Sequence, residues 1–259
     1  MLTHISYADG HFIAYQRLLR ASALAAGCDR SLALGPADID PEYRARHAAI
    51  LSAPRGAGYW LWKPWIALRQ LQKMAEGELL LYTDAGMLFV GDVAGLLERF
   101  AGCGSDLLFF GEGFSQGQYT RRDVFLAMAM DSPAMAAAPQ RFASAFLLRN
   151  SPWSRAFMAD YLALCEDPTL LTDQANQRGK ADYPDFVAHR HDQSIFSLLT
   201  YREELSCEGQ GLLAEGLPAP SGQVLNHSRC HSTPGELVRF LLRYGLLGFA
   251  ELKALDIEA

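Results

Sequence analysis

Apolar residues along this chain recur either at short, strand-like intervals or at helical spacing, and turn residues separate the two kinds of segment. Residues 4–8 alternate briefly between polar and apolar side chains and end at Asp9-Gly10, which predicts a strand followed by a turn. A helix is predicted next, because apolar residues then recur at roughly helical spacing up to Gly27, namely Phe12, Ile13, Tyr15, Leu18, Leu19, Ala23 and Leu24. A strand, a turn and a helix in this order typically open an α/β unit.

The same alternation continues through the rest of the chain. Further strands are predicted where short apolar runs lie between turn signals, at 79–83, 106–110 and 142–148. Helices are predicted where apolar residues have helical spacing or a capping signal precedes them, at 12–24, 39–50, 64–74, 91–100, 124–130 and 152–164, with two more that begin near Asp192 and Pro234. Polar segments without a clear period are predicted to be loops, at 111–119, 166–187 and 208–223, of which the second is a candidate lid.

Strands that alternate with helices, without an internal repeat or a low-complexity linker, predict one α/β domain with a mostly parallel central sheet flanked by helices. The 259 residues, half of them hydrophobic, are sufficient for one large domain with a sizeable core. The net charge of −6 and the absence of a basic patch argue against a nucleic-acid-binding protein.

Three features bear on the location of the protein. No apolar run approaches the ~18 residues of a membrane span, and the N-terminus lacks the pattern of a secretory signal. The five cysteines are scattered and odd in number, which predicts reduced, mostly structural thiols in a cytoplasmic protein. The apolar tail after Tyr244 is expected to pack on the body of the protein, and a peripheral contact with the inner face of a membrane is the alternative.

The first candidate for chemistry is a carboxylate that directly follows a predicted strand. Asp84 comes after the apolar run 79–83, and ligands of open α/β sheets bind at the carboxyl ends of the strands. Ala85 and Gly86 are small enough to let a ligand approach the backbone closely. Asp84 is therefore predicted to face a bound metal or a ribose; the alternative is a plain turn in which Gly86 supplies a positive φ.

Two further groups of polar residues are candidates, and an aromatic segment accompanies them. His191, Asp192 and Gln193 stand at the start of a predicted helix, where Asp192 could also be a simple helix cap. A late loop holds further side chains that could bind a metal or a phosphate, namely His227, Arg229 and His231. Around Lys63 the tryptophans are dense, and at least two of them are expected to be core residues, among Trp60, Trp62 and Trp65.

Three motifs in this order resemble those of bacterial nucleotide-sugar glycosyltransferases of the GT-A fold, of the kind encoded in capsule and surface-polysaccharide clusters. The motifs are Gly58-Tyr59-Trp60-Leu61-Trp62-Lys63-Pro64, Leu81-Tyr82-Thr83-Asp84-Ala85-Gly86 and His189-Arg190-His191-Asp192-Gln193-Ser194. The resemblance covers the chain from Ile5 to about His231. It implies a single domain over residues 1–259, with a nucleotide-binding part at 1–110 and an acceptor-side and C-terminal part at 111–259.

The resemblance also implies roles for individual residues. The donor would contact Ile5 and Tyr7 at the base, Asp84, Ala85 and Gly86 at the ribose and metal, and Lys63 and Arg229 at the phosphates. Such enzymes hold a divalent ion on an Asp-x-Asp motif, which here lacks its second carboxylate. Mn²⁺ or Mg²⁺ would then be held by Asp84 and His227, with His231 as the fallback, and Mn²⁺ accepts imidazole more readily than Mg²⁺.

The expected reaction is the transfer of a hexose from a nucleotide-sugar, a UDP-sugar, to a glycan or lipid-linked acceptor. Asp192 would bind sugar hydroxyls, and Gln193 would stabilise the developing oxocarbenium through its carbonyl, which favours retention of configuration. Two alternatives stay open. One is a metal-dependent hydrolase that uses His189, His191, Asp192 and His227; the other is a non-catalytic glycan-binding protein whose donor site has decayed.

Overall fold

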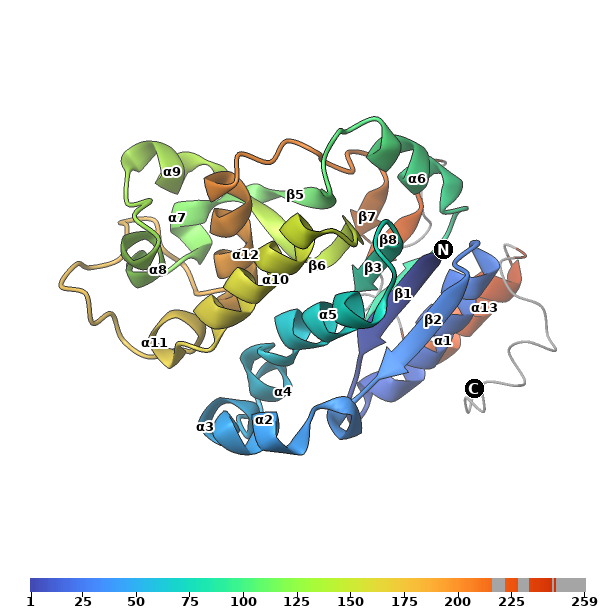
Figure 1. The fold of residues 1–259 in the computed structure, drawn as a ribbon, viewed down its shortest axis with the longest axis horizontal. Coiled ribbons are helices and arrows are strands. Elements are labelled where there is room, and N and C mark those ends of the chain that lie inside the picture. Colours follow the sequence, from blue (N-terminus) through green and yellow to red (C-terminus); the bar gives the residue numbers. More distant parts are fainter. Residues whose placement is uncertain (216–221, 228–232, 244, 246–259) are drawn as a thin grey trace. The chain divides into compact units, whose positions relative to one another are not determined.

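The computed structural model describes residues 1–215, 222–227, 233–243 and 245 (Figure 1). The chain forms two compact units, each built from segments that are distant in sequence. Unit 1 consists of Met1–Asp38, Glu78–Gly104 and Gly209–Ala259, and unit 2 of Ile39–Gly77 and Ser105–Glu208. Each unit contains residues from both sides of residue 110, so the units do not coincide with the ranges 1–110 and 111–259. The assignment of nucleotide and acceptor roles to those two ranges stays a prediction.

Unit 1 is built on three parallel strands. The central strand β1 (Leu2–Tyr7) pairs with β2 (Arg30–Leu34) on one side and with β3 (Leu79–Thr83) on the other (Figure 1). The helix α1 (Phe12–Ala25) connects β1 to β2, and a short 3₁₀ turn, η1 (Pro36–Asp38), follows β2. All six residues of β1 are buried, as expected for a central strand of a parallel sheet.

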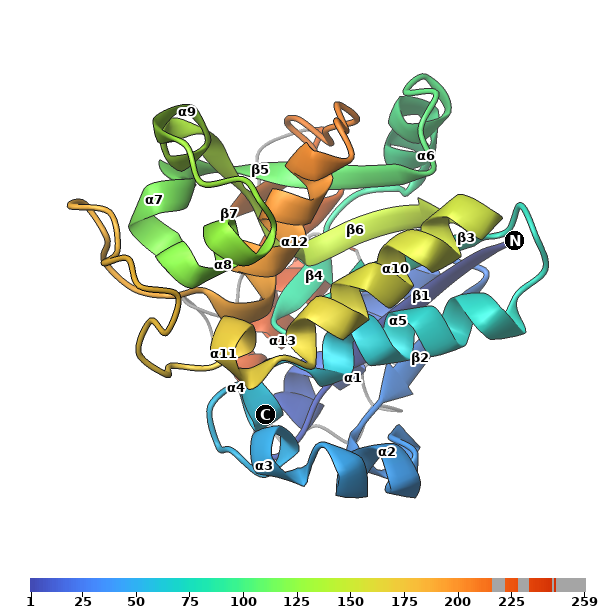
Figure 2. The ribbon, with the colours of Figure 1, turned by 60° about the vertical axis from the view of Figure 1, so that its left-hand side comes forward.

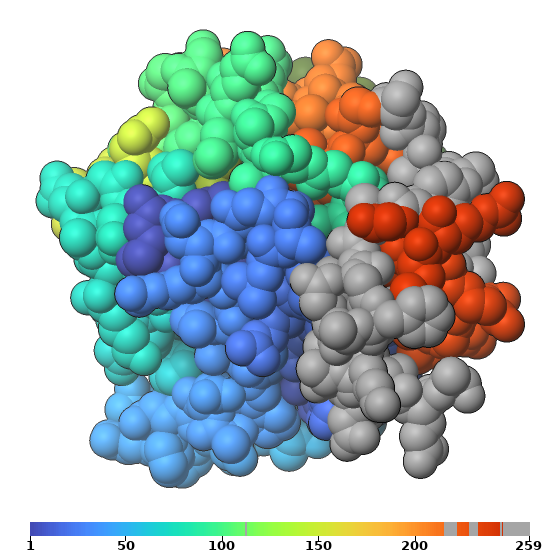
Figure 3. Space-filling view, turned by 90° about the vertical axis from the view of Figure 1, so that its right-hand side faces the viewer, coloured from blue at the N-terminus to red at the C-terminus, as the bar shows by residue number. Residues whose placement is uncertain are grey.

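A second, smaller sheet completes unit 1. Strand β4 (Met87–Phe89) runs antiparallel to β8 (Leu225–His227), which pairs in parallel with β7 (Leu213–Glu215). Helix α6 (Ala94–Ala101) follows β4, and α13 (Pro234–Arg243) packs its buried leucines against those of α1 and β4, in a cluster of Leu18, Leu88, Leu237 and Leu241. Figure 3 shows α13, in red, at the surface of this unit.

Unit 2 is built on an antiparallel strand pair covered by helices. Strand β5 (Leu107–Ser115) pairs with β6 (Pro139–Arg149), and α12 (His191–Arg202) packs on β6. Helix α10 (Pro152–Cys165) contacts both α12 and α5 (Trp62–Lys73) (Figure 2). Aromatic rings fill the contact between α10, α12 and β6, because the ring of Phe196 meets those of Phe146, Phe157 and Tyr161 at 5.4–6.0 Å.

Short helices connect these larger elements of unit 2. They are α2 (Pro41–Arg46), α3 (Ala48–Leu51), α4 (Gly56–Tyr59), α7 (Gln116–Tyr119), α8 (Arg122–Ala127), α9 (Pro133–Ala137) and α11 (Pro168–Leu171). Several begin at the side-chain caps that short helices need, such as Asp40, Ser132 and Asp167.

The predicted fold class is confirmed: the structure is α/β, with mostly parallel strands flanked by helices. The strand 79–83 and the helices at 12–24 and 152–164 are confirmed to within a few residues, and the capping box of Thr233 and Glu236 is present. The prediction of a loop at 111–119 is wrong, because β5 continues to Ser115 and α7 follows. The prediction of a helix within 39–50 is confirmed, and the structure has two short helices there, α2 and α3, because the chain bends at His47, which has φ −107°.

The prediction that all five cysteines are reduced is wrong for two of them. Cys103 and Cys207 are disulfide-bonded, whereas Cys28 and Cys165 are free and buried. Sequence spacing could not reveal this, because disulfide formation depends on which cysteines the fold brings together. In the described part of the chain no helix has the length and apolar character needed to cross a bilayer. A cytoplasmic location and a contact with a membrane face stay predictions, and the tail from residue 246 lies outside the described residues.

Candidate functional site

In unit 1, the parallel strands bring Tyr7 and Asp84 to the same edge. Ile5 lies level with Tyr82 in the register of β1 and β3, so Tyr7 and Asp84, two positions further along each strand, lie beyond them on the same face and at the carboxyl edge. Ile5 is fully buried and Tyr7 is nearly so, whereas Asp84 is half-buried. The sequence predicted this edge, which is where ligands bind in open α/β sheets.

The carboxylate of Asp84 is held by its own strand. The hydroxyl of Tyr82, two residues earlier on the same face, donates to Asp84 Oδ1 at 2.6 Å. The backbone then turns, because Met87 N–H donates to Asp84 O at 3.1 Å, and Ala85 and Gly86 are buried within that turn. Asp84 is therefore both the last residue of the edge and the first of a tight turn. The expectation that Gly86 supplies a positive φ in this turn is wrong, because Gly86 is not among the residues with positive φ.

The smaller sheet of unit 1, formed by β4, β8 and β7, brings His227 to the same turn. His227 pairs with Met87 in the antiparallel ladder of β4 and β8, and Met87 is the residue whose N–H closes the turn on Asp84. A carboxylate and an imidazole are a suitable donor set for Mn²⁺. Within the described ranges, no group of three or more His, Cys, Asp or Glu side chains could hold a metal ion. The other predicted contacts of this region, Arg229 and His231, lie outside the described residues.

In unit 2, Asp192 forms a buried ion pair with Lys63. Lys63 Nζ lies 2.7 Å from Asp192 Oδ2, and the two side chains are 3% and 5% exposed. The hydroxyl of Tyr161 donates to the carboxylate and the backbone carbonyl of Asp192, both at 3.2 Å. Lys63 and Tyr161 are therefore partners of the Asp192 carboxylate. The predicted contacts of Lys63 with a phosphate and of Asp192 with sugar hydroxyls stay predictions.

The alternative in which Asp192 is a plain helix cap is wrong. Helix α12 begins at His191, one residue before Asp192, and the carboxylate of Asp192 faces Lys63 and Tyr161. The helix start is instead tied by Ser194, whose hydroxyl accepts from Arg190 N–H and donates to the Tyr119 carbonyl. The N-cap position itself is Arg190, and its side chain makes no capping hydrogen bond.

Gln193 is half-buried, and its side chain is oriented by a neighbouring amide. Gln193 Nε2 donates to Gln140 Oε1 at 2.9 Å, and Gln140 Nε2 in turn donates to Thr120 Oγ1 at 3.2 Å. The hydrogen bond places the nitrogen of the Gln193 carboxamide toward Gln140. The role of its carbonyl oxygen stays a prediction.

The segment that leads from Trp60 to Lys63 begins in a left-handed turn. The five residues from Gly56 to Trp60 all have positive φ, between 50° and 100°. For residues with a Cβ, such as Ala57, Tyr59 and Trp60, the left-handed conformation costs about 1–2 kcal/mol each. Of the tryptophans, Trp62 and Trp65 are buried, which confirms that at least two belong to the core.

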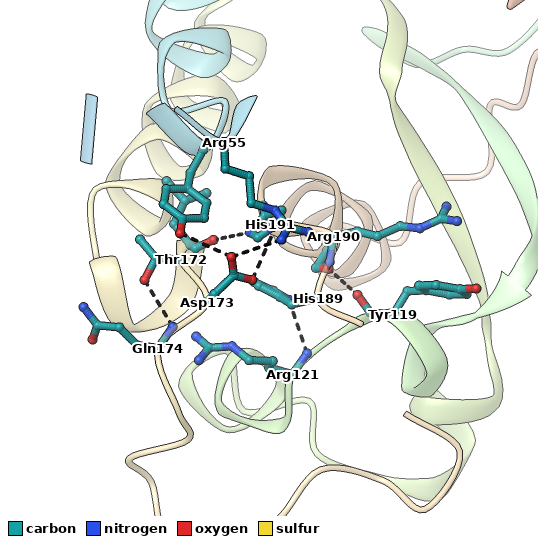
Figure 4. Close-up of polar contacts among 12 residues, drawn as sticks. Arg55, Tyr119, Arg121, Thr172, Asp173, Gln174, His189, Arg190 and His191 are labelled. Atoms are coloured by element: carbon teal, nitrogen blue, oxygen red, sulfur yellow. Dashed lines mark hydrogen bonds and ion pairs between the residues drawn. The ribbon is translucent and has the colours of Figure 1, made fainter. Parts of the chain in front are cut away.

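His189 and His191 are hydrogen-bonded to the backbone. Figure 4 shows His189 beside Arg121, whose N–H donates to His189 Nδ1 at 3.4 Å. His189 Nε2 lies 2.8 Å from Leu170 O, and His191 Nδ1 lies 2.8 Å from Leu171 O. Burial lowers the pKa of both imidazoles, so both are neutral near pH 7. The metal-dependent hydrolase is therefore not favoured, because these two histidines are hydrogen-bonded into the structure.

Around His191 lies an outer polar group that sequence reasoning missed. Asp173 accepts from the Tyr59 hydroxyl at 3.2 Å and pairs with Arg55 at 3.3 Å, and its Oδ1 is 3.9 Å from His191 Nε2 (Figure 4). Asp173 and Tyr59 are 114 residues apart in the chain, so no local pattern could indicate their contact.

The contact of Tyr82 with Asp84 in unit 1 could have been predicted from the sequence, since residues two apart on a strand share a face.

Residues 172–190, most of the predicted lid, form a segment with defined anchors. Asp131, on the loop before α9, accepts from Lys180 Nζ and the Tyr183 hydroxyl at 2.7 Å each, and pairs with Arg122 at 3.0 Å. Asp123 accepts from two backbone N–H groups of the segment, those of Gln177 and Arg178. Ion pairs and hydrogen bonds therefore hold the middle of a segment that contains neither a helix nor a strand.

The comparisons with known proteins bear on the fold alone. No family model and no curated protein sequence matches this chain. Among solved structures, the galactosyltransferase LgtC in complex with donor and acceptor sugar analogues has a TM-score of 0.53 at 15% identity, over 98% of this chain and 99% of that one. Mouse xyloside xylosyltransferase 1 gives 0.47 at 13% identity, over 90% and 98% of the two chains. A glycosyltransferase involved in glycosylation of the major capsid of PBCV-1 gives 0.44 at 11%, over 95% and 99%.

The likeness to LgtC extends over nearly the full length of both chains. At this level of identity it shows that the two share a fold, and the α/β architecture with a mostly parallel sheet is that of GT-A glycosyltransferases. Similar folds host different activities, so function has to be argued from the residues of the site.

Proposed function

We propose that this chain is a glycosyltransferase that moves a hexose from a UDP-sugar to a glycan or lipid-linked acceptor, with retention of configuration. The observation that carries the proposal is the position of Asp84. It is a half-buried carboxylate, held by Tyr82, at the carboxyl edge of parallel strands in a GT-A-type fold. This is the edge at which a nucleotide ligand is expected in open α/β sheets.

In the proposal, the edge of unit 1 binds the nucleotide part of the donor. Tyr7 lies beside the base, and the turn of Asp84, Ala85 and Gly86 lies against the ribose and the diphosphate, with Arg229 as a further phosphate contact. Asp84 and His227 would hold Mn²⁺, or less readily Mg²⁺. A divalent ion supplies positive charge that stabilises a departing diphosphate. The backbone register that brings His227 to the turn of Asp84 supports this donor set.

Unit 2 would act on the sugar. The Asp192 carboxylate would accept hydrogen bonds from sugar hydroxyls, and it is paired with the ammonium of Lys63, 2.7 Å away. Gln193 is an amide and therefore a poor covalent nucleophile. Its carbonyl, oriented through the bond to Gln140, would face the positive charge that develops on the anomeric carbon. Stabilisation of this cation by the Gln193 carbonyl is the basis on which we propose transfer to the same face of the sugar.

The donor site can be tested with a matched pair of carboxylates in unit 1. Asp84 stands at the carboxyl edge of the parallel strands, and Asp29 at the amino edge, where its Oδ2 accepts from Leu2 N–H at 2.6 Å. We expect Asp84→Asn to lower kcat/KM for UDP-sugar turnover by well over tenfold, and Asp29→Asn to change it less than threefold. UDP with Mn²⁺ should raise the melting temperature of the wild type and not that of Asp84→Asn. Equal turnover by both variants would exclude the site.

The role of Gln193 is tested with a second glutamine of unit 2. Gln193→Ala should lower kcat by more than tenfold at unchanged melting temperature, whereas Gln177→Ala, an exposed position, should behave as the wild type. NMR of the product gives the anomeric configuration, and a configuration opposite to that of the donor would exclude retention. Calorimetry that shows glycan binding without nucleotide binding would instead support the non-catalytic alternative.

A further inference from the structure

The left-handed turn at Gly56–Trp60 and His191 carry an inference about how Asp192 is held. Five consecutive residues with positive φ, three of which have side chains, are a conformation that an L-amino-acid chain adopts only when its surroundings impose it. Residues in such conformations cluster at functional sites, so an observed outlier is a reason to ask what the strained backbone positions.

A hydrogen bond and a close backbone approach hold the turn in place. Trp62 Nε1 donates to Gly56 O at 3.0 Å and ties the end of the turn to its beginning. Gly58 is in contact with α3 so closely that a Cβ at this position would lie 2.7 Å from Leu51 Cα. A glycine is therefore required there both for its positive φ of 100° and for space.

The result of the turn is that two aromatic rings face His191. The ring of Trp60 stacks on the imidazole at 5.5 Å with an interplanar angle of 23°, and the ring of Tyr59 lies 5.1 Å from it. His191 itself has a φ of 51°, so a second strained residue lies on the other side of the contact. The His191 Nδ1 lies 2.8 Å from the carbonyl oxygen of Leu171, and this hydrogen bond fixes the imidazole of the residue that directly precedes Asp192.

The same two segments continue directly into the buried ion pair. Lys63 N–H donates to Trp60 O at 2.9 Å, so the ammonium group extends from the residue that closes the turn. Asp192 follows His191 in the chain and meets Lys63 Nζ at 2.7 Å. The strained turn therefore lies just before Lys63 in the chain, and the strained His191 lies just before Asp192.

We propose that the turn at 56–60 and His191 form a positioning lock for Asp192, with Tyr59, Trp60 and His191 as positioning residues. The lock fixes the backbone on both sides of the Lys63–Asp192 pair, so that the carboxylate has one orientation before any sugar binds. Asp173 joins the lock to segment 172–190 through the Tyr59 hydroxyl and Arg55. The role in turnover rests on the proposed function, whereas the lock itself can be measured without activity.

The first test uses two glycines of unit 2 that both have positive φ. Gly58→Ala introduces strain and the contact with Leu51, whereas Gly77→Ala, at φ 85° with no heavy atom within 4 Å of the added Cβ, introduces strain alone. Hydrogen exchange of the Trp62 indole N–H reports the turn directly. We expect exchange at least tenfold faster in Gly58→Ala than in the wild type, and less than threefold faster in Gly77→Ala. Equal exchange in the two variants would show that the turn is not held in this way.

The second test removes the His191 ring and keeps its backbone. Asparagine tolerates the left-handed conformation, so His191→Asn tests the imidazole alone, and His191→Ala tests ring and backbone together. The lock requires that His191→Asn lowers kcat at least tenfold, leaves the donor KM within threefold and keeps the melting temperature. A merely structural histidine would lower the melting temperature and leave kcat unchanged, and that outcome would overturn the proposal.

The two tests separate the lock from the proposed function. Should the wild type turn over no nucleotide-sugar, the proposed function fails, and the exchange of the Trp62 indole in His191→Asn still decides the lock. Faster exchange in that variant shows that His191 supports the turn, and unchanged exchange overturns the lock. Turnover by the wild type together with full kcat in His191→Asn would overturn the lock and leave the proposed function intact.

Discussion

Lys63 and Asp192 show at the scale of single residues why a buried charge needs its partner. Both side chains are almost fully buried, and the ammonium and carboxylate are 2.7 Å apart, with Tyr161 as a further donor to Asp192. Removal of one partner leaves the other charge buried without compensation, which costs far more than the pair contributes. The stability of unit 2 and the orientation of Asp192 therefore depend on the same contact.

Lys63→Met tests this contact through the free energy of unfolding. We expect a loss of about 3–5 kcal/mol in urea titrations, because the methionine fills the space of the lysine stem and leaves the carboxylate unpaired. The control is Lys73→Met, an exposed lysine on the same helix, for which a change below about 0.5 kcal/mol is expected. The double variant Lys63→Met with Asp192→Leu should recover part of the loss. A single variant as stable as the wild type would contradict the account.

At the scale of elements, segment 172–190 shows how a stretch without helix or strand is held. Three donors converge on the carboxylate of Asp131, and two of them, Lys180 and Tyr183, belong to the segment. Burial alone would raise the pKa of Asp131, but hydrogen bonds from Lys180, Arg122 and Tyr183 outweigh it and hold the pKa well below its usual range. Asp131 therefore stays ionised in mild acid, and its contribution is lost only as the pH falls below the normal carboxylate range.

Asp131→Asn should loosen this segment without unfolding the protein. The amide removes the charge that Lys180 and Arg122 share, so cleavage by trypsin after Lys180 is expected to be at least fivefold faster at neutral pH. Asp160→Asn, which breaks a surface pair with Arg202 in the same unit, is the matched control and should cleave at the wild-type rate. The melting temperature, measured alongside, separates local opening from global unfolding. Equal cleavage of both variants would count against Asp131 as the anchor.

At the scale of the whole molecule, the core of unit 1 makes global stability depend on pH. His4 lies at the centre of β1 with no exposed surface, and its ring nitrogens contact the hydroxyls of Ser31 at 2.8 Å and Thr83 at 2.9 Å. Burial lowers the pKa of His4 to about 3. The unfolded chain, with an ordinary histidine pKa near 6.5, therefore binds one more proton than the folded chain between these two values.

The sign of the effect follows from the lowered pKa. The stability associated with neutral His4 is fully present above pH 6.5 and is lost progressively as the pH falls toward 3, with a limiting slope of about 1.4 kcal/mol per pH unit. Urea titrations between pH 7 and 5 should therefore show a smaller slope for His4→Gln, which keeps polar atoms and does not titrate, than for the wild type. His11→Gln, an exposed histidine of the same unit, is the control and should retain the full slope. Identical slopes in wild type and His4→Gln would contradict the assignment.

Local sequence patterns determined several of the elements and one edge of the site. The apolar run 79–83 between turn residues specified β3, and the carboxylate after it had to lie at the carboxyl edge of a parallel sheet, because the direction of a strand fixes its ends. The helix cap at Ser151 and the capping box before α13 could likewise be predicted from the sequence, since they involve residues three positions apart.

Only the tertiary structure decided which distant residues meet. The sequence allowed Asp192 to be a helix cap, and the fold places its carboxylate on Lys63, 129 positions earlier, and on Tyr161. It likewise joins Asp173 to Tyr59, 114 residues earlier in the chain. Side-chain partners across such separations depend on how whole elements pack, and a left-handed turn such as Gly56–Trp60 exists only because that packing outweighs the local preference of the backbone.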